Sequence, residues 1–193
     1  MGASATDEVL LHDLTARYSE PHRKYHTLQH LDECFERLAE IKTEAVHPEE
    51  VEFALWFHDA VYDTKRQDNE VKSADWARST VLAANLHTAV AERVHALVMA
   101  TRHNAVPSGT DERILVDVDL SILGAKPERF DEYDNQIREE YSWVPGIVFR
   151  SKRRAILKEF LARPTIFSTQ KFIDAYEVLA RENLERSIEQ LGG

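Results

Sequence analysis

A His-Asp pair lies where it could bind a metal ion. His58 and Asp59 come near the end of an apolar run that starts at Ala54. His58 shares a helical face with Val51, so its imidazole is predicted to point inward. Burying the Asp59 carboxylate without a counter-charge would cost on the order of several kcal/mol, and a bound cation would remove that cost. The alternative is a hydrogen-bonded core histidine beside an aspartate that faces solvent.

A second pair of histidines precedes it in the chain. His26 and His30 are four residues apart, so on a helix both would lie on one face and could share a metal. Zinc proteases use this spacing, with a glutamate after the first histidine as the general base. Thr27 occupies that position here, so the protease interpretation fails. The alternative is a helix-start region with surface histidines.

A later aspartate lies within the apolar run 114–123. The neighbours of Asp119 three and four residues away on a helix are all apolar: Leu115, Val116, Ile122 and Leu123. Asp117 instead has Arg113 four residues before it, which indicates a wetter face with a counter-charge available. Asp119 is therefore the better candidate for a buried carboxylate that needs a cation. The alternative is that Asp119 is simply solvated.

The elements that must position these residues are predicted to be helices. The spacing of apolar residues predicts helices over 27–42, 49–61, 69–84, 88–102, 111–123, 148–161 and 170–190, and another through Phe130, Tyr133, Ile137 and Tyr141 that stops before Pro145. No segment shows sustained period-2 alternation, and the chain has only 6 glycines and 6 prolines. The sequence predicts an all-α fold without a domain boundary.

Composition narrows the class of protein. A chain of 193 residues suits one compact domain. It carries 24 basic and 34 acidic residues, a net charge of −10, which disfavours a nucleic acid polymer as partner. No apolar run approaches the roughly 18–20 residues that span a membrane, and the single cysteine, Cys34, cannot form an internal disulfide. We expect a cytoplasmic location and no membrane partner; the oligomeric state stays open.

Taken together, the histidine, the His-Asp doublet and the later aspartate resemble the HD superfamily of metal-dependent phosphohydrolases. Segments 23–31, 57–63, 119–124 and 137–141 resemble a subfamily of small, largely uncharacterised predicted HD phosphohydrolases. The resemblance implies a single HD-type helical bundle over residues 1–193. Its metal-binding core would cover about 20–125, with C-terminal helices at 126–191 packed on it.

The resemblance also implies a ligand set. The metal would be held by His26 or His30, together with His58, Asp59 and Asp119. The family's opening motif aligns better with His26, which leaves His30 as a second-site ligand or an outer group. Some HD proteins add histidines between the doublet and the last aspartate to hold a second metal. His103 is the candidate for such a ligand, with His95 as a weaker alternative.

Hydrolysis would need a water activated by the metal and groups that bind phosphate. A bound metal lowers the pKa of water from about 15.7 toward about 7. Asp59 or Asp63 would orient that water or accept its proton. The cationic residues expected to bind the substrate's anionic group are Arg23, Lys24, Arg138 and Arg150.

Metal and substrate stay open at the level of sequence. His and Asp ligands suit several divalent ions, and Mn, Fe, Co, Ni, Zn and Mg are not distinguished. The expected substrate is a small phosphate ester, with nucleotides among the candidates. Two other classes are considered: an HD-type di-iron oxygenase, for which His103 would be an added ligand, and a non-catalytic nucleotide-binding module. The intact His-Asp doublet argues against the second.

Overall fold

A computed structural model describes residues 5–102 and 106–192. The helices in order are α1 (Ala5–Tyr18), α2 (Leu28–Ile41), η1 (Lys42–Glu44), α3 (Pro48–Phe57), α4 (Asn69–Ala83), α5 (Thr88–Ala100), α6 (Thr110–Leu120), η2 (Ser121–Gly124), α7 (Pro127–Glu140), α8 (Gly146–Leu161) and α9 (Gln170–Gln190). These ranges contain no β-strand, so the predicted all-α class is confirmed. In the same ranges no helix has both the length and the apolar character needed to cross a membrane.

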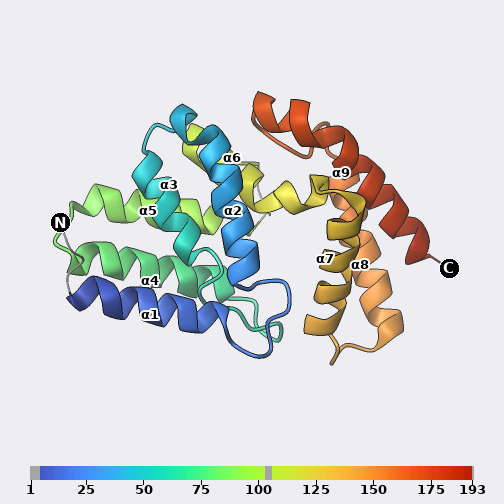
Figure 1. Cartoon of the computed structure of the whole chain (residues 1–193), viewed down its shortest axis with the longest axis horizontal. Helices are drawn as coiled ribbons and strands as arrows, with labels where there is room; N and C mark the ends of the chain where they lie inside the picture. Colours follow the sequence, from blue (N-terminus) through green and yellow to red (C-terminus); the bar gives the residue numbers. More distant parts are fainter. Residues whose placement is uncertain (1–4, 103–105, 193) are drawn as a thin grey trace.

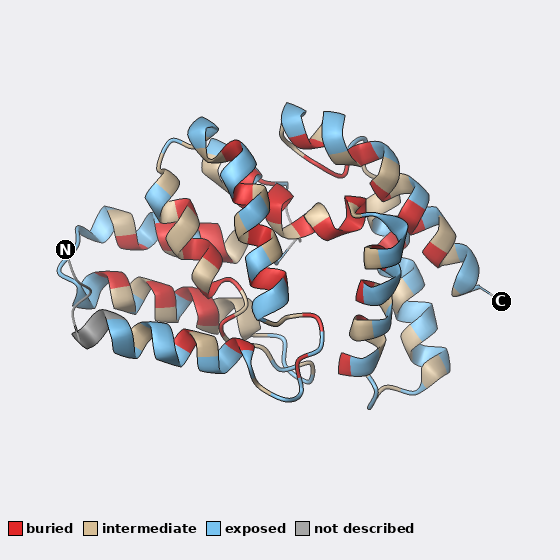
Figure 2. Cartoon of the chain, in the orientation of Figure 1, coloured by how far each residue is buried: buried red, intermediate tan, exposed pale blue. Residues whose placement is uncertain are grey.

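The helices form two groups joined by η2. Helices α1 to α6 make up the larger group, and α7, α8 and α9 lie together at the other end (Figure 1). Helix α3 is central to the larger group because it contacts α2, α4, α5 and α6. Its side chains Val51, Ala54 and Leu55 are fully buried, and buried residues lie on the facing sides of the helices (Figure 2). The first group thus supplies a rigid core beneath the predicted His-Asp doublet.

Contacts at η2 and α6 hold the second group to the first. Gly124 in η2 lies so close to α9 that an added Cβ would be 2.6 Å from the Cβ of Tyr176. Asp117 of α6 is fully buried, and it accepts hydrogen bonds from the backbone N–H of Ser168 at 2.8 Å and of Thr169 at 2.7 Å. The Thr169 hydroxyl adds a third at 2.7 Å. The prediction of a wetter face for Asp117 was therefore wrong: tertiary packing brings the start of α9 to it.

We expect Asp117→Ala to lower the free energy of unfolding by about 2–5 kcal/mol. The substitution leaves the donors of Ser168 and Thr169 buried without an acceptor. Urea unfolding measures the loss. Asp174→Ala is the control, because that carboxylate is exposed and accepts one hydrogen bond, from Gln170; its effect should stay within about 0.5 kcal/mol. Equal stability of the two variants would refute this role for Asp117.

Two helix boundaries differ from the sequence prediction and matter for the site. Helix α2 begins at Leu28, with Thr27 as its N-cap, so His26 lies before the helix and does not share a face with His30. Helix α3 ends at Phe57, and the chain turns through Asp59 and Ala60. Helix α1 was not predicted at all.

Candidate metal centre

Four side chains from three helix segments converge at one point. His30 comes from α2, His58 and Asp59 from the turn that ends α3, and Asp119 from the last turn of α6. The Nε2 atoms of His30 and His58 are 3.1 Å apart. Asp59 Oδ2 lies 3.2 Å from His58 Nε2 and 3.7 Å from His30 Nε2. Asp119 Oδ1 lies 3.4 Å from His30 Nε2 and 3.7 Å from His58 Nε2.

These separations fit ligands around a single ion. Metal–ligand bonds of about 2.0–2.2 Å place neighbouring donor atoms about 3–3.6 Å apart in octahedral or tetrahedral geometry. His58 Nδ1 is hydrogen-bonded to the Leu55 carbonyl at 2.7 Å, which turns Nε2 toward the cluster. A carbonyl partner on the far ring nitrogen is the usual support for a metal-binding histidine. The cluster can therefore hold a metal ion.

The electrostatics of the cluster favour a cation. The side chains of His30 and His58 are 2% and 1% exposed. Burial lowers the pKa of His58, but the neighbouring Asp59 and Asp119 carboxylates outweigh it and raise this pKa to about 9. Burial raises the pKa of Asp59, yet the positive charge of His58 brings it well below its usual range. A bound cation at this point would interact with the same two carboxylates.

Cys34 also lies beside the cluster, a neighbour that the sequence analysis did not identify. It forms a potential metal-binding group with His30, His58 and Asp119. Its Sγ is 3.7 Å from both Nδ1 and Nε2 of His30, so it sits beside the ring rather than in line with one nitrogen lone pair. Burial also raises the pKa of the thiol well above its ordinary value. Asp59, which contacts His58 directly, is the better fourth ligand.

Cys34→Ser is accordingly expected to keep its metal. The Sγ of Cys34 lies beside the His30 ring, whereas Asp59 and Asp119 each bring an oxygen within 3.2–3.4 Å of one imidazole Nε2. Metal content and affinity should stay within about threefold of the unaltered chain, since the loss is smaller than the roughly 10–100-fold typical of an outer-shell partner. Titration with Co²⁺ also gives a direct reading, because a sulfur ligand adds a charge-transfer band near the ultraviolet. If the Cys34→Ser variant lost its metal, and the unaltered chain loaded with Co²⁺ showed this band, Cys34 would be a ligand.

His26 is placed differently from the sequence prediction. Its Nδ1 lies 2.8 Å from Glu140 Oε2, and its ring stacks on Tyr62 with centroids 4.1 Å apart. Glu140 also accepts the backbone N–H groups of Lys24, Tyr25 and His26 and the hydroxyl of Tyr62. Tertiary contacts thus direct His26 to Glu140, and His30 takes the position beside His58 that the alignment favoured for His26.

Three of the four cationic residues predicted to bind phosphate hydrogen-bond to nearby groups of the protein. Arg23 has a fully buried side chain that donates to Glu20 and to the carbonyls of His26, Asp59 and Ala60. Its guanidinium therefore holds the turn that carries Asp59. Lys24 Nζ donates to the Pro21 carbonyl, and Arg138 donates to the carbonyls of Tyr141 and Val144. Arg150 is exposed, and neither it, Lys24, Arg23 nor Arg138 lines the cleft beside the cluster. The structure therefore does not bring these four residues to this cleft, and their role in binding phosphate stays a prediction.

Two further predictions have different outcomes. Asp63 is exposed and does not line the cleft; its carboxylate accepts the Lys65 N–H at 2.9 Å within a turn, so it is not brought to the cluster. His103 lies outside the described residues.

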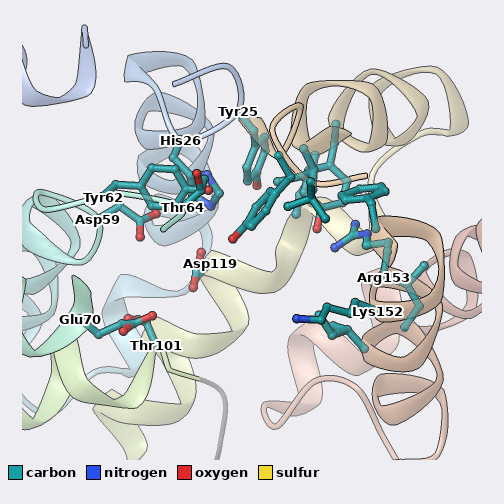
Figure 3. Close-up of a pocket in the computed structure, with 18 of the residues that line it drawn as sticks. Tyr25, His26, Asp59, Tyr62, Thr64, Glu70, Thr101, Asp119, Lys152 and Arg153 are labelled. Atoms are coloured by element: carbon teal, nitrogen blue, oxygen red, sulfur yellow. The ribbon is translucent and has the colours of Figure 1, made fainter. Parts of the chain in front are cut away.

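The cluster opens into a cleft of about 510 Å³ between the two helix groups. His26, Asp59 and Asp119 lie at one side, and Lys152 and Arg153 of α8 at the other (Figure 3). The side chains of Asp59 and Asp119 are 19% and 13% exposed, so the carboxylates form the open side of the cluster. A cleft of this size is typical of small-molecule sites.

No family model, curated protein or solved structure matches the chain. The resemblance to HD phosphohydrolases therefore stays a prediction. The metal cluster and the cleft stand on the geometry alone.

The sequence analysis also missed residues of the cleft itself. Glu70 and Thr101 line it below Asp119, and Lys152 lies on the opposite wall (Figure 3). Their segments carry no motif, and helical periodicity does not show which helices face each other across a cleft. Only the packing of α7 against η2 and of α8 against α9 places Lys152 across the cleft from the candidate metal ligands.

Proposed function

We propose that the chain is a metal-dependent phosphohydrolase of the HD type that acts on a small phosphate ester. The observation that carries the proposal is the convergence of His30, His58, Asp59 and Asp119 at one side of a cleft. Two imidazoles and two carboxylates suit a divalent ion such as Mn, Fe, Co, Ni or Zn. The partial exposure of the carboxylates leaves room for water and substrate.

A divalent metal bound there would polarise a phosphoryl oxygen and supply a nucleophilic hydroxide at neutral pH. Asp59 would align the attacking water as well as bind the ion. The His26–Glu140 pair has a separate role in the proposal. Glu140 engages Nδ1 of His26, which leaves Nε2 as the nitrogen that can hold a proton in the cleft. There His26 would protonate the departing alcohol.

The test is a screen for phosphate release after purification without chelator. The chain would be assayed with phosphomonoesters and nucleotides in the presence of Mn²⁺, Fe²⁺, Co²⁺, Ni²⁺, Zn²⁺ or Mg²⁺, and its metal content measured by elemental analysis. We expect at least one metal to bind in a 1:1 ratio and to support turnover. Failure to retain or reload any metal would refute the proposal. Iron uptake with an oxygen-dependent absorbance change, and no phosphate release, would favour an oxygenase instead.

A further inference from the structure

The cleft wall opposite the metal centre carries a cation with no protein partner of its own. Lys152 of α8 is exposed and forms no hydrogen bond or ion pair with the residues of the described ranges. The other cations that line the cleft are engaged: Arg66 pairs with Asp68, Arg153 pairs with Asp134, and Lys65 lies over the Trp143 ring. In Figure 3 the Lys152 ammonium points into the cleft toward the side of Asp119.

Apart from Lys152 and the paired Arg153, the side chains of α7 and α8 on that wall are apolar or aromatic. Tyr133 and Ile137 of α7 line it together with Ile156 and Phe160 of α8. Ile156 is 46% exposed although it faces the cleft, so this wall has apolar surface that the protein leaves uncovered. Flat apolar groups bind such walls by burial and by ring packing against tyrosine and phenylalanine.

We propose that the substrate is a phosphate monoester of an aromatic alcohol. Its phosphoryl group would lie between the metal ligands and Lys152, and its ring against the wall formed by α7 and α8. This inference rests on the proposed function for the position of the phosphoryl group. Lys152 supplies a positive charge in a chain with a net charge of −10, so a dianionic phosphoryl group meets both the metal and one unpaired ammonium. A small polar alcohol would leave the apolar wall in water.

Binding of phosphonates, which cannot be hydrolysed, tests the inference independently of turnover. Calorimetry on the Mn²⁺-loaded full chain would compare phenylphosphonate with methylphosphonate. We expect phenylphosphonate to bind at least about tenfold more tightly. Burying about 100 Å² of apolar ring surface at about 25 cal/mol per Å² corresponds to more than a tenfold gain in affinity. Equal affinity for the two would overturn the apolar-wall assignment.

Lys152→Ala should weaken both phosphonates by about 10–100-fold, the range for a hydrogen bond between charged groups. Lys158→Ala is the matched control: it is an exposed lysine on the same helix, outside the cleft lining, and its loss should change affinity less than twofold. Ile156→Ser should reduce the preference for phenylphosphonate by about threefold or more. Ile147→Ser, 76% exposed on the same helix and away from the cleft, should not.

The outcomes separate this inference from the proposed function. Phosphonate binding that depends on Lys152 and Ile156, without hydrolysis of any ester, would sustain the ligand class and refute the hydrolase. Hydrolysis that is insensitive to Lys152→Ala, or as fast with glycerol 2-phosphate as with 1-naphthyl phosphate, would sustain the hydrolase and refute the ligand class.

Discussion

Asp119→Ala is expected to abolish phosphate release and to bring metal content to background. The substitution removes a carboxylate that lies 3.4 Å from His30 Nε2 and 3.7 Å from His58 Nε2. A bound ion would lose a ligand and a counter-charge together. We expect at least about a 10³-fold loss of turnover, well beyond the roughly 10–100-fold effect of an outer-shell change. Phosphate release and elemental analysis measure the two losses.

Asp117→Ala provides the control two positions away on the same helix. Asp117 points to the start of α9, so its loss should lower stability and leave the metal site intact in the protein that remains folded. Asp119→Ala should instead unfold at nearly the same urea concentration as the metal-free parent chain. If Asp119→Ala kept full metal content and turnover, the metal centre would be misassigned.

His30→Ala and His26→Ala are expected to fail in different ways. His30→Ala should lose metal and turnover together, because its Nε2 is within 3.7 Å of all three other ligand atoms. His26→Ala should keep the metal and lose turnover by about 10²–10⁴-fold, the range for a general acid. The sequence analysis predicted the reverse order for these histidines.

The dependence on leaving group identifies the role of His26. p-Nitrophenolate departs without a proton, whereas an alkoxide does not, so His26→Ala should slow alkyl phosphates much more than p-nitrophenyl phosphate. Glu140→Gln should show a weaker form of the same pattern, because an amide keeps the fold of segment 24–26 better than alanine but supports His26 less well. Loss of metal from His26→Ala would make it a ligand instead.

Much of the ligand set could be predicted from the sequence because its positions are defined within single helices. The apolar face that includes Val51 indicates that His58 points inward, and His58 is 1% exposed. Asp119 was selected by its apolar neighbours, but the contrast with Asp117 failed, because Asp117 is the more buried of the two. The same periodicity indicates an all-α fold. These are local properties, repeated every three or four residues, and they survive folding because each helix buries the face that its apolar residues define.

Tertiary structure decided the rest, because those residues depend on partners far away in the chain. His26 lies before α2, and its direction is determined by Glu140, 114 residues later. Arg23 donates hydrogen bonds to the carbonyls of Asp59 and Ala60, which follow the end of α3. Asp117 is buried because the start of α9 packs against it and donates the Thr169 N–H to its carboxylate. Lys152 faces the candidate metal ligands only because α8 lies across the cleft from α6. Sequence spacing determines the face on which a side chain lies, whereas packing between helices determines what that face meets.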